Sequence, residues 1–177
     1  MIRFRFNADK AYQAILWMLG QADRLDLHIV LKACYFADKA HLNEFGRPVF
    51  GARYRAMKYG PVPLEIYEML KGEPLWLCET RNDDFPWSVG GRGTIQRKDA
   101  LPRPNLGVLS QTDLRHLEAG FARARAMTFD ERTRETHGRD WQRANLGIMD
   151  YADMIDDSPD REEKIEDLRS IAARIVV

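Results

Sequence analysis

The stretch KACYFADKAHLNEFGRPVFGARYRAMKYGPVPLEIYEML, residues 32–70, decides the fold of this chain. The stretch is rich in glycine, proline, tyrosine and phenylalanine, which lie where one element would end and the next begin. Its acids, its histidine and its arginines lie at helical and strand spacings. The pattern predicts a helix, a turn, an extended segment, a Gly-Pro-x-Pro turn and a second helix, with almost no residues between them.

The first helix is predicted from Leu27 to about Phe45. Asp26 suits its N-cap, and Gly46 suits a left-handed stop with a proline just beyond it. Its inward stripe, spaced 4, 3, 4 and 3 residues apart, consists of Leu27, Leu31, Cys34, Asp38 and His41. Asp38 and His41 therefore continue an apolar face, and we expect them to lie partly buried as an i, i+3 pair.

The extended segment over residues 49–59 is the strongest candidate for contact with a partner. Alternation along a strand places Arg53, Arg55 and Tyr59 on one face and Lys58 on the other. Tyrosine and arginine are enriched at the cores of protein interfaces, and a strand near a sheet edge can also accept a partner strand. The candidate partner-binding residues are therefore Arg53, Arg55, Lys58 and Tyr59. An ordinary surface strand is the alternative.

The rest of the chain predicts further helices around a small amount of sheet. Helices are expected over 8–20, from Pro63 to Lys71, from Ser110 onward, within 129–149, and over about 158–175. Residues 87–97 could form a hairpin or an edge pair that supports the 49–59 strand. The expected fold class is α+β: a predominantly α-helical single domain over 1–177, with its core motif at about 26–71. Its small antiparallel β element comprises a strand at about 49–59 and a hairpin at about 75–97.

The composition narrows the functional classes. The 27 basic and 27 acidic residues give zero net charge, which argues against a dedicated nucleic-acid binder. Residues 150–177 hold nine acids against four basic residues, so this segment carries −5 and residues 1–149 carry +5. The acidic C-terminal helix is either a solvated face or a surface that steers a charged protein partner.

The location follows from what the sequence lacks. No apolar run approaches the roughly 20 residues that cross a bilayer, so no membrane contact is expected. Cys34 and Cys78 make neither a disulfide framework nor a zinc spacing, which fits a reducing cytoplasm. We expect each to be a buried structural thiol, with Cys78 in a possible strand.

Asp38 and His41, joined in space by His137, could instead form a metal-assisted hydrolase site. Metal chemistry usually needs three or four convergent ligands, and two residues at i, i+3 supply half a site at best. A structural polar network is the favoured interpretation, with His137 and Trp141 as a packing pair; its members are Asp38, His41, His137 and Trp141. No catalytic residue, no metal and no cofactor is expected.

The blocks YFADKAHL, GRPVFGARYRAMKYGPVP and IYEML together resemble the Panacea domain family of SocA-like antitoxins. The resemblance is strongest over about 26–71. It implies a bacterial, cytoplasmic antitoxin that neutralises a cognate protein toxin by direct binding. It also implies a possible route as a proteolytic adaptor that delivers the toxin to a cytoplasmic protease or its unfoldase. A phage-associated regulatory adaptor without a toxin is the alternative within this class.

Overall fold

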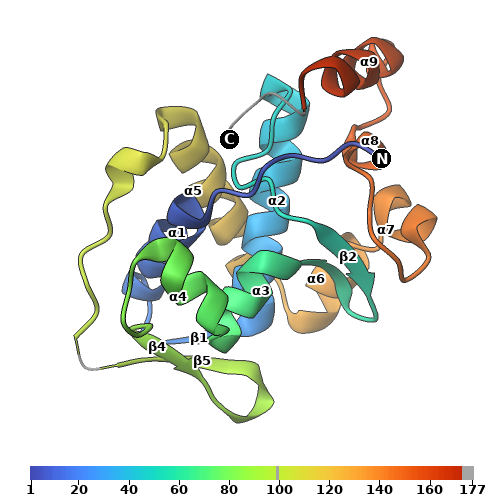
Figure 1. Ribbon diagram of the computed structural model, residues 1–177. Helices are drawn as coiled ribbons and strands as arrows, with labels where there is room; N and C mark the ends of the chain where they lie inside the picture. The colour runs from blue at the N-terminus through green and yellow to red at the C-terminus, as the bar shows by residue number, and fades with distance from the viewer. Residues whose placement is uncertain (99, 173–177) are drawn as a thin grey trace.

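Helix α2 (Leu27–Phe45) occupies the centre of the computed structural model, which describes residues 1–98 and 100–172 (Figure 1). The Asp26 side chain accepts a hydrogen bond from the backbone N–H of His28, and Gly46 ends the helix at φ 68°. Both predicted ends of this helix are therefore confirmed. Its buried face extends through Asp38 and His41, whose side chains are inaccessible to solvent.

Helix α5 (Gln111–Ala126) packs along α2, and α1 (Ala8–Gly20) lies beside them (Figure 1). Gly120 permits the close approach of α5, because a Cβ there would lie 2.6 Å from the carbonyl oxygen of Ala33. The Ser110 and Asp113 side chains form the predicted capping box at the start of α5. These helices enclose a single core of apolar side chains.

Two small antiparallel sheets lie on different sides of α2 (Figure 1). Strands β2 (Tyr54–Met57) and β3 (Gly60–Pro63) form a hairpin, and β5 (Thr94–Arg97) pairs with both β1 (Arg24–Asp26) and β4 (Trp87–Val89). The predicted hairpin therefore exists over residues 87–97, but its expected start at about 75 is wrong, because residues 74–80 are helical. It pairs with β1, however, and does not support the 49–59 strand.

The Gly-Pro-x-Pro segment was expected to be a turn, and this prediction is wrong. It forms β3, and the turn consists of Lys58 and Tyr59. The Leu64 N–H donates to the Arg53 carbonyl at 2.8 Å, so every second residue pair of the hairpin, counted from Arg53 and Leu64, is hydrogen-bonded. The two prolines, Pro61 and Pro63, lie in the residue pairs that are not hydrogen-bonded. A proline is tolerated there because its missing N–H is not needed.

The helices after the hairpin differ from expectation in detail. Cys78 lies in α4 (Pro74–Thr80) and is exposed, because Pro74 starts a helix where a strand was expected; Cys34 is buried as expected. The last helix begins after the Ser-Pro pair, at Arg161, and the end of its predicted span lies outside the described residues. The other helices are α3 (Leu64–Lys71), α6 (Phe129–Glu135), α7 (Arg139–Ala144), α8 (Tyr151–Met154) and α9 (Arg161–Ile171).

The architecture is a predominantly helical α+β fold with a small antiparallel β element, as the sequence predicts. Within residues 1–98 and 100–172, no helix is both long and apolar enough to span a bilayer.

Candidate functional site

The outward face of the β2–β3 hairpin carries two of the predicted partner-binding residues, Arg53 and Arg55. Both side chains are exposed, while Tyr54 between them and Ala56 after Arg55 are buried. Arg53 donates from Nε to Glu65 Oε1 at 2.6 Å and from its backbone N–H to Glu65 Oε2 at 2.8 Å. Among the described residues, the Arg55 guanidinium makes one long contact, 3.4 Å from Nε to the Leu146 carbonyl. The predicted alternation is therefore confirmed over residues 53–57, but it ends there, because Lys58 and Tyr59 form a turn in which both are exposed.

The second edge of β2 is covered by residues 147–149. The Ala56 N–H donates to the Gly147 carbonyl at 2.9 Å, and the Met149 N–H donates to the Tyr54 carbonyl at 2.8 Å. Arg55 and Ile148 stand directly opposite each other across this bridge. Because β3 occupies the first edge, the expectation that a partner adds a strand to β2 is wrong. A partner would meet side chains on this face.

The other two candidates, Lys58 and Tyr59, form the hairpin tip. The Tyr59 side chain is 48% exposed and meets the edge of Phe129 at 5.1 Å between ring centroids. The Lys58 ammonium lies 5.2 Å from the centre of the Tyr59 ring. Gly60 follows at φ 97°, and a Cβ there would lie 2.4 Å from Thr136 Oγ1. Only glycine suits this position, because both the dihedral angle and the space exclude a side chain.

Three side chains bond to carbonyl groups at this end of the hairpin, and a fourth stacks on one of the three. Trp141 Nε1 donates to the Met57 carbonyl at 2.9 Å, and Lys32 Nζ donates to the Pro61 carbonyl at 2.8 Å. His28 Nε2 lies 3.0 Å from the Tyr59 carbonyl, and the His137 ring stacks on Trp141. We call these four residues the hairpin clamp: His28, Lys32, His137 and Trp141.

The clamp is rich in basic groups whose charged forms are disfavoured. Burial, and then the charge of Arg132, lower the pKa of Lys32 to about 7. Burial lowers the pKa of His28 to about 4, and burial followed by the Lys32 charge lowers the pKa of His137. Since Arg132 Nε donates to His28 Nδ1 at 3.1 Å, the neutral His28 ring carries its proton on Nε2 and donates it to Tyr59.

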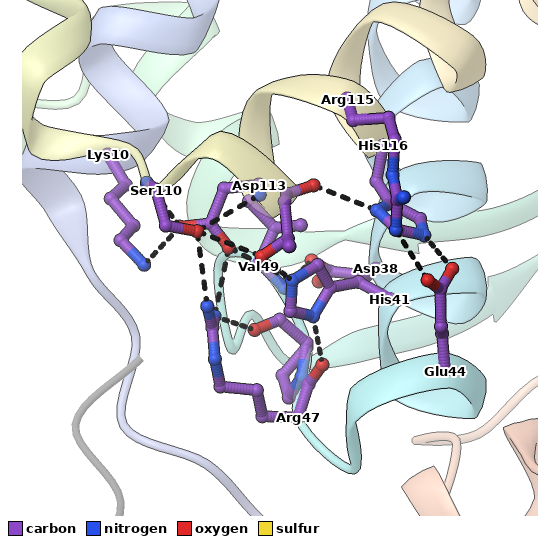
Figure 2. A network of polar contacts seen from close by, with 12 residues as sticks. Lys10, Asp38, His41, Glu44, Arg47, Val49, Ser110, Asp113, Arg115 and His116 are labelled. Carbon is purple, nitrogen blue, oxygen red and sulfur yellow. Dashed lines mark hydrogen bonds and ion pairs between the residues drawn. The ribbon is translucent and has the colours of Figure 1, made fainter.

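A second polar network, centred on Asp113, lies under the carboxyl-terminal half of α2 (Figure 2). Asp113 accepts from Lys10 Nζ at 2.9 Å and from the Ser110 N–H at 3.0 Å, and it lies 2.9 Å from Arg47. Burial opposes its ionised form, but these donors hold the pKa of Asp113 at about 2. The carboxylate therefore joins α1, α5 and the segment after α2.

His41 belongs to this network. Its Nδ1 lies 2.8 Å from the Arg47 carbonyl, and its Nε2 lies 3.0 Å from the Thr112 hydroxyl and 3.3 Å from Asp113 (Figure 2). Burial lowers the pKa of His41, so the neutral ring donates from Nδ1 and accepts at Nε2.

Asp38 has different partners. It accepts from the Val49 N–H at 2.8 Å, the Phe50 N–H at 2.9 Å and the Tyr54 hydroxyl at 3.0 Å. Burial raises its pKa to about 7 against these donors. Asp38 thus fastens the segment before β2 to α2, and it does not orient the His41 ring.

The four residues expected to form one polar network are therefore divided between two places. Asp38 and His41 lie on the buried face of the carboxyl-terminal half of α2. His137 stacks on Trp141 at the hairpin tip, with ring centroids 3.7 Å apart and planes 9° apart. Within the described residues, no group of three His, Cys, Asp or Glu side chains could hold a metal ion. The three residues of the hydrolase alternative do not converge.

Several residues of these networks carry no individual prediction from the sequence. Asp113 appears in the capping motif, but a capping motif does not show that its carboxylate also receives Lys10 and Arg47. Lys32 and Arg132 are buried, although such residue types are mostly exposed.

A comparison with known protein families shows to which family the chain belongs. The family described as "Antitoxin SocA-like, Panacea domain" matches residues 30–142. The chain belongs to this family. Searches of curated proteins and of solved structures gave no significant match. The matched region of this Panacea domain runs from α2 to α7 and includes the β2–β3 hairpin with three of its clamp residues, Lys32, His137 and Trp141.

Proposed function

We propose that this chain is an antitoxin that binds and neutralises a cognate protein toxin through the face and tip of the β2–β3 hairpin. The contact residues are Arg53, Arg55, Lys58 and Tyr59. The observation that carries the proposal is the exposed Arg and Tyr side chains on a hairpin whose tip carbonyls are fixed from beneath. A surface already ordered before binding loses little conformational entropy when it meets its partner.

Neutralisation in this proposal is non-enzymatic and takes place in the bacterial cytoplasm. The antitoxin occludes the toxin directly or, as an adaptor, presents it to a cytoplasmic protease or its unfoldase. The acidic helix α9 is a second candidate contact, because its acids Glu162, Glu163, Glu166 and Asp167 are all exposed. Opposite charges on two parts of one molecule speed the encounter with a partner of complementary polarity.

Charge reversal on the hairpin tests this proposal. The tagged chain is purified from its native cytoplasm as wild type and as Arg55→Glu with Lys58→Glu, and the bound proteins are identified. We expect a small protein to co-purify stoichiometrically with the wild type and to be lost from the double variant, which stays folded. A matched control, Lys71→Glu with Arg103→Glu, changes the charge equally at two exposed sites and is expected to retain the partner.

Two results would count against the proposal. Equal recovery of the partner by the folded hairpin variant would remove the hairpin from the interface. A partner that does not arrest growth when expressed alone would favour the regulatory adaptor over the antitoxin.

A further inference from the structure

A small apolar cavity opens beside the outward face of the hairpin. Its volume is about 110 Å³, and it lies between the N-terminal segment, the start of β2 and residues 148–151. The lining is mostly apolar and includes Phe4, Phe6, Ala52, Ile148, Met149 and Tyr151. Ile148 is 37% exposed, so one wall of the cavity continues onto the surface.

Next to this wall, Leu146 is held in an unusual position. Its backbone has φ 63°, which bulky residues rarely adopt, and its side chain is 57% exposed. The Leu146 carbonyl contacts Arg55, so the Leu146 backbone lies beside this arginine. A large apolar side chain fixed on the outside in a strained backbone contributes little to the core, but it can contribute to a contact surface.

The rim of the cavity is cationic. Arg3 lines the cavity and Arg55 lies opposite Ile148; among the described residues, no carboxylate lies within 4.0 Å of either guanidinium. Arg53 also lines it, but is paired with Glu65. Asp150 nearby is occupied by the backbone N–H groups of Ile2 and Ala152. The rim therefore has two guanidinium groups free to meet an acid.

We infer that this cavity and its rim form a docking groove for an acidic segment of the partner protein with one aliphatic anchor. The anchor would enter the cavity beside Ile148, and flanking carboxylates would pair with Arg3 and Arg55. Bidentate pairing of arginine with a carboxylate supplies direction, while the buried anchor supplies affinity. The inference rests on the proposed function and specifies the chemistry of the toxin surface that is recognised.

Site-specific photo-crosslinking in the native cytoplasm tests the groove. A photo-reactive phenylalanine replaces Leu146 in one variant, Lys58 at the hairpin tip in a second, and Phe45, an exposed aromatic residue on α2, in a third. Cross-linked peptides are then sequenced. We expect the Leu146 position to capture a partner peptide rich in Asp and Glu around an aliphatic residue. Adding Arg3→Glu and Arg55→Glu should reduce its yield by roughly tenfold or more, because like charges would then face each other.

Each other outcome is decisive. Cross-links to a partner from Lys58 but none from Leu146 would overturn the groove and leave the proposed function standing. A basic or uncharged peptide at Leu146 would overturn the inferred chemistry. Residues 150–172 of a second copy at Leu146 would make the groove a self-association site. If neither Leu146 nor Lys58 captures a protein, the groove and the proposed function both fail.

Discussion

Two polar networks lie against the two halves of α2, and they hold their buried charges in different ways. The carboxyl-terminal half contributes to the Asp113 network, where a carboxylate meets Lys10 and Arg47. The amino-terminal half contributes Lys32 to the hairpin clamp, where its ammonium meets a carbonyl group and no described carboxylate within 4.0 Å. A buried ion with a counter-ion keeps its charge, whereas one with only a dipole tends to lose it. The comparison separates a region that stabilises the fold from one that positions a surface.

The largest loss of stability is expected in the Asp113 network, where the buried charges have counter-ions. Replacing Asp113 by Asn leaves the buried Lys10 and the partly buried Arg47 without their carboxylate, and breaking a buried pair destabilises by about 3–5 kcal/mol. Urea denaturation measures the free energy of unfolding. Asp167→Asn, at an exposed acid on α9, is the matched control and should change it by less than about 0.5 kcal/mol. Equal effects at the two positions would show that Asp113 is not a structural centre.

The close packing of the hairpin tip is tested by Gly60→Ala. The left-handed backbone and the contact with Thr136 Oγ1 both oppose a Cβ, so we expect a loss of roughly 2–3 kcal/mol. Gly20→Ala at the end of α1, where nothing lies within 4 Å, should be neutral or slightly stabilising. Thermal unfolding of both variants measures the difference. A neutral Gly60→Ala would mean that the tip is not held as closely as the structure shows.

The hairpin clamp and the Asp113 network should also differ in how their contributions to stability depend on pH. The folded-state pKa of Lys32, about 7, lies below its ordinary value of 10.5, so the unfolded chain binds more protons between these values and stability rises with pH. The Lys32 contribution should grow by about 2 kcal/mol from pH 7 to pH 9. Lys32→Met should remove this gain from the urea-denaturation profile. An unchanged slope in the variant would show that Lys32 stays charged when folded.

The contribution of the Asp113 network to stability changes over a different, more acidic pH range. Its folded-state pKa of about 2 lies below the ordinary value of 3.8, so its contribution is complete above pH 4 and is lost as the pH falls toward 2. Asp113→Asn should flatten the acid limb of the stability profile and leave the alkaline limb as in the wild type. A variant that flattened the alkaline limb and kept the acid limb would contradict the assignment of these two pH responses to Lys32 and Asp113.

The smallest effect on stability is expected at the surface. Arg55→Glu removes one long contact to a carbonyl and should change the free energy of unfolding by less than about 0.5 kcal/mol. The same substitution should weaken partner binding, because the side chain is exposed on the proposed contact face. A calorimetric scan beside the pull-down separates the two quantities. A large loss of stability would make Arg55 a structural residue.

Local chemistry made much of α2 and α5 predictable. Asp26, Gly46 and the Ser110–Asp113 box satisfy backbone groups of their own helix ends, so their effect is readable within a few residues. The hairpin was harder, because Gly60 and Pro61 favour turns and only the pairing with β2 shows that they can lie in a strand.

The networks could not be assigned from spacing alone. The i, i+3 spacing of Asp38 and His41 shows that they share a face of α2, but not which segments pack on it: Asp38 meets residues 49–54, and His41 meets α5. The partnership of Lys32 with Pro61 depends on a tertiary contact that places the hairpin over α2. The exposed position of Arg55, in contrast, followed from simple alternation.

We propose that the hairpin face makes this Panacea domain an antitoxin. The most direct measurement is growth of cells that express the co-purified partner protein alone, with the wild-type chain, or with Arg55→Glu and Lys58→Glu. The account predicts growth arrest by the partner alone, rescue by the wild type and no rescue by the folded double variant. Equal rescue by both forms, or no arrest by the partner, would contradict it.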